Sequence, residues 1–370
     1  MKHTLKIAQI APLIESVPPR LYGGTERIVS FLTEELVAQG HDVTLFASGD
    51  SITSAKLTPI CGQALRLNSA IVDPLPYYML MLKEVHARAR EFDILHFHID
   101  QFHFPMFYAK SGRTVTTLHG RQDLPDLQAL YRGFPEMPLV SISQAQRTPI
   151  KDANFAGTVL HGLPTDLLPP TLHPQGGYLA FLGRVSEEKG VDRAVAIAKA
   201  VGLPLKIAAK VDKADTAYFE REIKPLLEPG FIDYIGEIDD RRKAKFLGNA
   251  RALLFPIRWP EPFGLVMIEA MACGTPVLAF RQGSVGEVID DGISGIIVES
   301  VPEAVRKLGA LLNLDRGRVR RQFEARFTTQ RMARDYVEIY RQRLGQLTQS
   351  PRTSVLESLR GGDSSEVVKH

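Results

Sequence analysis

The sequence predicts an α/β protein made of two Rossmann-like, doubly wound domains with a cleft between them. Short β-branched or apolar runs alternate with amphipathic helical patterns along the chain. The alternation stops once, in a segment rich in proline and glycine over residues 162–177, and then starts again. The length of 370 residues suits two domains of ordinary size.

The first half of the chain predicts a buried parallel sheet. Residues 5–11 predict the opening strand, a helix follows over about 25–39 and ends at Gly40, and residues 42–47 complete a βαβ unit. Further short apolar runs bounded by polar or turn residues predict more strands of this sheet, at 93–97, 114–118, 139–142 and 158–160. We therefore predict an N-terminal domain over residues 1–165.

The second half repeats the pattern. Strands are predicted at 178–182, 205–209, 231–235 and 252–256, and helices at 191–201 and 240–249. We predict a second domain over residues 166–327 and a final helix over 328–348. Residues 349–370 show little periodicity and are predicted to be a flexible tail.

An arginine-rich stretch from Arg316 to Arg343 also predicts helix. Its apolar positions follow an approximately helical spacing: Phe323, Phe327, Met332, Tyr336 and Tyr340. We interpret this stretch as a solvated helix with one packed face, in preference to a surface that binds membranes or polyanions.

Composition excludes several classes of protein. A chain that is 44% hydrophobic and 24% charged can bury a core, so it is not disordered. With 45 Lys+Arg against 42 Asp+Glu, it gives no indication of a nucleic-acid partner. Cys61 and Cys273 form neither a disulfide scaffold nor a metal-binding spacing. The apolar run at the start is short and interrupted by Gln9, so we expect a cytoplasmic protein with at most peripheral membrane contact, at the inner face.

Two motifs predict anion binding. Gly23 and Gly24 stand directly before the first predicted helix, where backbone N–H groups can approach an anion, although a simple turn explains the pair equally well. Arg184 and Lys189 lie just beyond a predicted strand, and two cations there suit a diphosphate. The alternative is that both are solvated loop residues.

A third motif contains two glutamates. Pro260 and Pro262 hold Glu261 in an extended loop, and Gly264 permits a tight entry into a helix. Glu269 then lies inside that helix among apolar neighbours. A buried carboxylate needs a partner, which is either ligand hydroxyls or an ion pair within the protein.

Together these motifs resemble the retaining GT-B glycosyltransferases of sequence family 4. The resemblance spans nearly the whole chain and rests on Gly23-Gly24, Leu118-His119-Gly120, Gly183-Arg184 with Lys189-Gly190, Glu261 with Glu269, the loop 286–292 and the pattern over 327–344. It implies a GT-B fold in which the first domain, residues 1–165, binds the acceptor, the second, residues 166–327, binds the nucleotide-sugar donor, and the C-terminal helix crosses back to the first domain. It also implies transfer of a sugar from a UDP- or GDP-linked donor, with retention at the anomeric carbon.

The resemblance implies a role for each residue. Arg184 and Lys189 would neutralise the diphosphate, which Gly23 and Gly24 would face across the cleft, and Glu269 would hold the ribose. Glu261 and His119 would contact the transferred sugar. Backbone N–H groups near three further residues would join the donor site: Phe263, Gly264 and Leu265. His119, Glu261, Arg184 and Lys189 are thus the candidate catalytic residues.

Some features remain open at this stage. The chain has no Asp-x-Asp pattern, so we expect no metal and a metal-independent transfer. His161-Gly162 stands where the family commonly has Asn-Gly, and Ala209-Lys210 stands where it often has glycine.

A GT-B-like sugar-nucleotide epimerase or phosphorylase is the alternative enzyme. A binding protein with a decayed site is the non-enzymatic alternative, and a nicotinamide oxidoreductase ranks lower. Glycan, lipid-linked and small-molecule acceptors all fit, as do a monomer and a homodimer.

Overall fold

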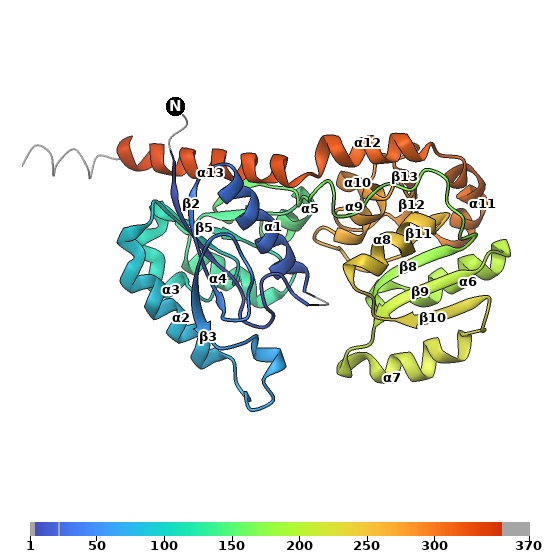
Figure 1. The fold of residues 1–370 in the computed structure, drawn as a ribbon, viewed down its shortest axis with the longest axis horizontal. Coiled ribbons are helices and arrows are strands. Elements are labelled where there is room, and N and C mark those ends of the chain that lie inside the picture. The colour runs from blue at the N-terminus through green and yellow to red at the C-terminus, as the bar shows by residue number, and fades with distance from the viewer. Residues whose placement is uncertain (1–3, 21–22, 350–370) are drawn as a thin grey trace, which may run out of the picture.

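The computed structural model describes residues 4–20 and 23–349. Two sheets form two lobes (Figure 1). The first has the strand order β3-β2-β1-β4-β5-β6-β7 and the second the order β10-β9-β8-β11-β12-β13, and the strands within both sheets pair in parallel. The predicted α/β fold with two doubly wound units is confirmed.

The first sheet holds the predicted strands and one more. Its strands are β1 (Lys6–Ile10), β2 (Asp42–Ser48), β3 (Lys56–Cys61), β4 (Ile94–Phe97), β5 (Thr114–Thr117), β6 (Leu139–Ser141) and β7 (Phe155–Thr158). Its helices are α1 (Gly24–Ala38), α2 (Leu75–Arg88), α3 (Phe104–Phe107), α4 (Pro125–Gly133) and α5 (Gln144–Arg147). The strand predicted at 158–160 was wrong in its bounds, because β7 ends at Thr158, and β3 was not predicted.

The second sheet follows the same plan. Its strands are β8 (Leu179–Arg184), β9 (Leu205–Lys210), β10 (Ile232–Gly236), β11 (Ala252–Phe255), β12 (Val277–Phe280) and β13 (Gly295–Val298). Its helices are α6 (Val191–Val201), α7 (Thr216–Tyr218), α8 (Asp240–Asn249), α9 (Leu265–Ala272), α10 (Val285–Val288) and α11 (Val301–Leu312). The bounds of α6 and α8 are those that the sequence predicted.

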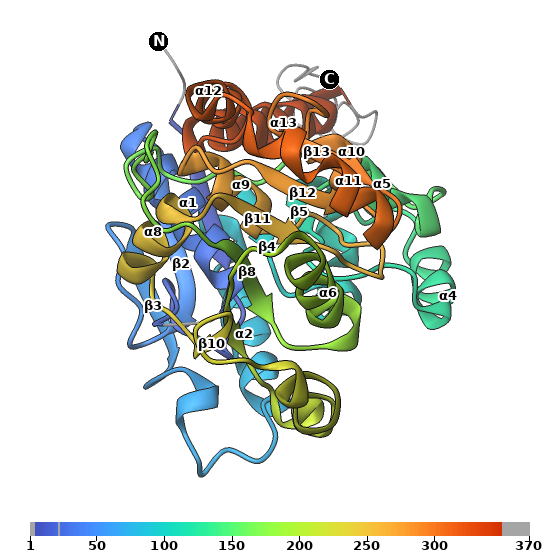
Figure 2. The same ribbon diagram turned by 90° about the vertical axis from the view of Figure 1, so that its right-hand side faces the viewer.

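The arginine-rich stretch forms two helices, and the second begins at Thr329, one residue after the start expected for the final helix. α12 (Arg316–Arg326) packs on the second lobe and α13 (Thr329–Gln349) lies along the first, as both views show (Figure 1, Figure 2). Met332, Tyr336 and Tyr340 of α13 are fully buried in one cluster with Ile7 and Val115. The expected helix crossing back to the first lobe is therefore present.

The chain passes between the lobes at two adjacent points. The Leu163 N–H donates to the Phe327 carbonyl at 2.8 Å, and the Thr329 N–H donates to the Leu163 carbonyl at 3.1 Å. Gly162 is required here, because a Cβ at this position would lie 2.2 Å from the Thr328 carbonyl oxygen. We retain limits near residues 165 and 327 as our proposal for the domains. The tail predicted over 349–370 lies outside the described residues, apart from Gln349 at the end of α13.

The interpretation of α12 as a solvated helix was also wrong for two of its arginines. Arg320 is buried and donates to the carbonyls of Leu168, Ala272 and Thr165 at 2.6–2.9 Å. Arg316 likewise donates to backbone carbonyls in the linker and at the end of α8. A guanidinium group carries five donors, so it can satisfy carbonyls of an irregular segment that has no ladder of its own.

In the part of the chain that the structure describes, no helix has both the length and the apolar character that crossing a membrane requires.

Candidate active site

A cavity of about 450 Å³ lies between the lobes, at the carboxyl ends of both sheets. Every residue that the sequence predicted for the site lines it: Gly23, Gly24, His119, Arg184, Lys189, Glu261, Phe263, Gly264, Leu265 and Glu269. Residues more than 240 positions apart in the chain thus share one cavity, as the fold prediction requires.

Gly264 sets the start of α9. Its φ of 78° is in the left-handed region, and a Cβ there would lie 2.8 Å from Met267 Cε and 3.0 Å from Phe255 Cζ. α9 therefore begins abruptly at Leu265, and its N-terminus borders the cavity. The α1 N-terminus is adjacent, since a Cβ on Gly24 would lie 3.6 Å from Leu265 Cδ1. Two helix N-termini in one cavity favour an anionic ligand.

Glu269 lies on the buried side of α9 and has a protein partner. Lys243 Nζ, from α8, donates to Glu269 Oε1 at 2.6 Å, and Lys243 also lies 3.3 Å from Asp240. The ion pair that the sequence left as an alternative is therefore present. Sequence reasoning did not identify Lys243: its spacing from Asp240 indicates an ion pair within α8 but not the contact with α9.

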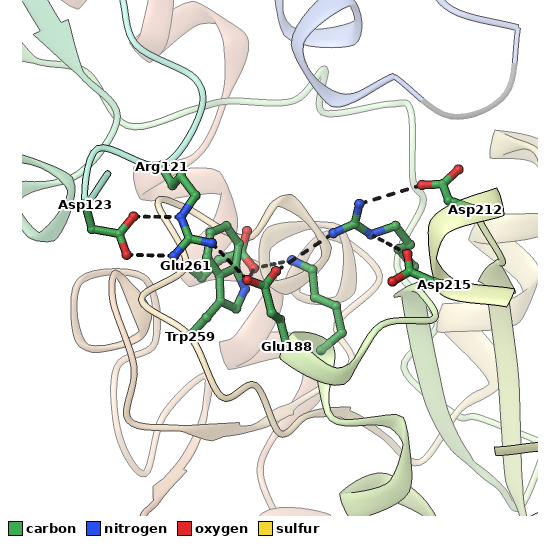
Figure 3. Close-up of polar contacts among 9 residues, drawn as sticks. Arg121, Asp123, Glu188, Asp212, Asp215, Trp259 and Glu261 are labelled. Atoms are coloured by element: carbon green, nitrogen blue, oxygen red, sulfur yellow. Dashed lines mark hydrogen bonds and ion pairs between the residues drawn. The ribbon is translucent and has the colours of Figure 1, made fainter. Parts of the chain in front are cut away.

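Glu261 is held from two sides. Lys189, in the short 3₁₀ turn Glu187–Lys189, donates to Glu261 Oε2, and Trp259 Nε1 donates to the same oxygen at 3.0 Å (Figure 3). The ammonium group of Lys189 also lies 4.9 Å from the centre of the Trp259 ring. In this state the Lys189 charge is balanced by Glu261, so an anionic ligand would have to share or replace that partner.

Arg184 has charged neighbours but weak contacts. At the end of β8, its guanidinium lies 3.7 Å from both Asp212 and Asp215 and 3.9 Å from Glu188 (Figure 3). Its buried Nε has no hydrogen-bond partner among the described residues. Although Nε lies 3.7 Å from Asp215 Oδ2, buried donors are nearly always hydrogen-bonded in proteins, so a donor without a hydrogen bond in a cavity indicates a place for a ligand.

Ion pairs cross the cleft between the lobes. Arg121 Nη1 donates to Glu188 at 2.9 Å (Figure 3). Arg27 of α1 pairs with Asp240 of α8. Sequence reasoning missed Arg27, which lines the cavity and is buried. It follows Gly23 by four residues, so it lies within the first turn of the helix that the two glycines open.

His119 contacts other histidines. Its Nε2 lies 2.9 Å from His98 Nδ1, and its ring stacks on that of His161 with centroids 5.4 Å apart. Burial lowers the pKa of His119 to about 3, so the imidazole is neutral at physiological pH. His161, the residue that departs from the family pattern, lines the cavity as well.

Two protein-family models match the chain. The model described as Glycosyltransferase Family 4 matches residues 22–148, and the one described as Glycosyl transferases group 1 matches residues 170–326. The chain belongs to the GT-B glycosyltransferases of the family 4 type. It is therefore an enzyme, a glycosyltransferase.

One of two sequence relatives is named as a mannosyltransferase, which supports this assignment. A phosphatidyl-myo-inositol mannosyltransferase of Mycobacterium leprae is 26% identical over 82% of this chain and 88% of that protein. An uncharacterized 41.2 kDa protein from the cps region of Klebsiella pneumoniae is 28% identical, but the match covers less than half of each chain (44% and 46%).

Solved structures share the fold of this glycosyltransferase. A sucrose-phosphate synthase from Thermosynechococcus elongatus has a TM-score of 0.74 and 20% identity over 91% of this chain and 98% of that one. HepE from Anabaena, solved with UDP and glucose, has a TM-score of 0.67 and 17% identity over 90% and 98%. These comparisons give the alternative of an epimerase or phosphorylase no support.

Proposed function

We propose that this glycosyltransferase is retaining and metal-independent, and that it moves a sugar from a UDP- or GDP-linked donor to a hydroxyl of a glycan, a lipid-linked or a small-molecule acceptor. The observation that carries the proposal is that Arg184, whose Nε makes no hydrogen bond among the described residues, lines the same cavity as Lys189 and two helix N-termini. Together these groups provide the positive field that a departing nucleoside diphosphate needs.

The proposed roles follow the positions of the side chains. Arg184 and Lys189 bind the diphosphate, together with Gly23, Gly24 and the start of α9 at Phe263, Gly264 and Leu265. Glu269 accepts from the ribose hydroxyls, with its charge already balanced by Lys243. Glu261 and His119 contact the transferred sugar.

The proposed sugar transfer requires no nucleophilic side chain from the protein. The bond from the anomeric carbon to the diphosphate oxygen breaks, and the acceptor oxygen bonds to that carbon on the same face. The acceptor proton moves to an oxygen of the leaving diphosphate. Arg184 and Lys189 stabilise the charge that develops on that leaving group, as preorganised cations do.

The identity of the donor base is part of the proposal. A solved relative of the same fold is described with UDP and glucose, and a sequence relative is named as a mannosyltransferase, so both nucleotides stay in the proposal. We propose that the protein works in the cytoplasm or at the inner face of the membrane, as a monomer or homodimer, without nucleic acid.

Arg184→Ala and Lys189→Ala are each expected to weaken nucleoside-diphosphate binding. A charge-assisted contact contributes about 1.5–3 kcal/mol, so the dissociation constant should rise roughly tenfold or more. Calorimetry with UDP and with GDP on the parent protein and both variants measures this. Lys199→Ala is the matched control, because Lys199 lies on α6 with Glu228 as its ion-pair partner. Equal affinity in the parent and both site variants would refute the assignment.

Turnover is expected to persist in excess chelator. Arg184, Lys189 and the two helix N-termini supply the positive charge in this proposal, so no divalent ion has a necessary place. The measurement is release of nucleoside diphosphate from the donor with and without EDTA. Complete loss of turnover with EDTA, restored by adding a divalent ion, would contradict metal independence.

A further inference from the structure

We propose that Gln9 and His98 are positioning residues that hold His119 in a single tautomer, with its Nδ1 free of a proton and able to accept a hydrogen bond from a donor-sugar hydroxyl. The proposal rests on the role of His119 proposed above, and it adds two residues that the family motifs do not include. It concerns how His119 is prepared for the sugar rather than whether it lies in the cavity.

Gln9, His98 and His119 form a continuous hydrogen-bonded chain. Gln9 Oε1 lies 2.7 Å from His98 Nε2, and His98 Nδ1 lies 2.9 Å from His119 Nε2. Gln9 and His98 are buried, with 0% and 2% of their surfaces exposed, whereas His119 lines the cavity. These hydrogen bonds therefore connect the core of the first lobe with the candidate active site.

The orientation of the Gln9 side-chain amide determines which atom donates in each hydrogen bond of this series. In the structure its Nε2 faces His96 Nδ1 and Tyr340 Oη, each at 3.4 Å, and its Oε1 faces His98 Nε2 at 2.7 Å. Tyr340 belongs to α13, and its hydroxyl also lies 2.7 Å from His96 Nδ1, so the crossover helix helps to hold the amide in place.

The proton positions then follow one from another. An amide oxygen can only accept, so His98 Nε2 carries a proton. His98 is neutral, because burial lowers its pKa well below 6.5, and its Nδ1 is therefore an acceptor. His119 Nε2 must then donate to it. Neutral His119 is left with an unprotonated Nδ1, for which the described part of the chain provides no hydrogen-bond partner.

A bare His119 Nδ1 makes the cavity selective for donor sugars that present a hydroxyl group to it. An unprotonated nitrogen can accept a hydrogen bond from a hydroxyl group, but it cannot donate one to a group that only accepts. A donor sugar in which the contacting hydroxyl is replaced by fluorine or hydrogen should therefore lose affinity. A buried polar group that loses its partner is costly, and this cost is what makes such sites selective.

Nitrogen NMR of the full-length protein tests the tautomer directly. In protein labelled with ¹⁵N-histidine, long-range proton–nitrogen correlations distinguish a protonated Nε2 from a protonated Nδ1, and His119→Gln identifies the signals of His119. We expect His119 to show a protonated Nε2 and a bare Nδ1. A protonated Nδ1, or a ring with both nitrogens protonated, would overturn the proposal.

Two variants of His98 test the positioning role. In His98→Asn the side-chain amide reaches the place of Nδ1 and can still accept from His119, whereas in His98→Gln it reaches the place of Nε2 and cannot. We compare the dissociation constant of UDP with that of UDP-glucose, and of GDP with that of GDP-mannose. His98→Gln should weaken the nucleotide sugar roughly fivefold to tenfold, about one hydrogen bond, and leave the nucleotide alone unchanged. His98→Asn should retain the parent preference.

The outcomes separate this proposal from the proposed function. If the parent binds a nucleotide sugar but both variants behave alike, His98 only fills space and the positioning role is wrong. If the parent binds neither nucleotide nor nucleotide sugar, the proposed function fails, and the NMR result still decides the tautomer.

Discussion

At the residue scale, each of the two motif glutamates has a lysine of its own. Glu261 pairs with Lys189 and Glu269 with Lys243, and the two lysines come from different elements. In the first pair, Glu261 also accepts a hydrogen bond from Trp259 Nε1. The pair of Lys243 and Glu269 is buried deeper in the cavity wall. The two carboxylates therefore start from different surroundings and should respond differently to loss of their charge.

Glu269→Gln is expected to act mainly through donor binding. Contacts with the ribose are similar in the ground state and the transition state, so the Michaelis constant for the donor should rise more than turnover falls. Glu261→Gln should instead lower turnover at saturating donor, by an amount on the order of 2–4 kcal/mol in the barrier, because Glu261 is assigned to the carbon where positive charge develops. Steady-state kinetics on both variants makes the comparison. The opposite pattern would mean that the two roles are exchanged.

These residues show which parts of the site a sequence can predict. Glu261, Glu269, Arg184 and Lys189 stand at fixed positions after strands, so the motifs were enough to bring them into one cavity. Lys243 and the His98–His119 contact depend on how two separate elements pack, and no local pattern encodes that packing. The sequence could only state that Glu269 needs a partner.

At the element scale, α12 fastens the linker to the second lobe. The buried guanidinium of Arg320 binds carbonyls at residues 165 and 168 of the linker and at the end of α9. Helical spacing predicted the packed face of α12 and α13 correctly, since Phe323, Tyr336 and Tyr340 are all fully buried. The break between the two helices, at Phe327 and Thr328, is held by hydrogen bonds to Leu163 across the molecule, and the sequence pattern does not show these contacts.

Arg320→Met is expected to lower the free energy of unfolding by at least about 2 kcal/mol, since it leaves several carbonyls without their charged donor. Arg321→Met is the matched control, because Arg321 is the next residue of the same helix and is exposed. Urea unfolding of both variants gives the difference. Equal stability of the two variants would show that the Arg320 contacts contribute little.

At the scale of the whole molecule, a group of neutral histidines is buried in the first lobe and at the cavity. Burial lowers the pKa of each of them: His96, His98, His103, His119 and His161. Burial acts in the opposite direction on three carboxyl groups, Glu15, Glu26 and Asp100, and raises the pKa of Asp100 to about 6.

The free energy of unfolding is expected to fall as the pH drops from about 7 to 5. The unfolded chain takes up protons on these histidines near pH 6.5 and the folded chain does not, so acid favours unfolding by up to about 1.4 kcal/mol per pH unit for each histidine. The three carboxyl groups oppose this trend, because their raised pKa values stabilise the folded state at lower pH, but the histidines outnumber them. Urea unfolding at several pH values measures the slope, and His98→Asn should reduce it. A stability that stays constant from pH 7 to 5 would refute the prediction.

The adjacent crossings at Leu163 and Thr328 also make the second lobe resemble an inserted module. A polypeptide that enters and leaves a unit through neighbouring, hydrogen-bonded positions can in principle have that unit removed and the gap closed by a short graft. The first lobe that remains would keep α13 packed on its own sheet. The same geometry allows lobes from different members of the family to be exchanged at one seam, so that a chimaera could combine the acceptor half of one enzyme with the donor half of another.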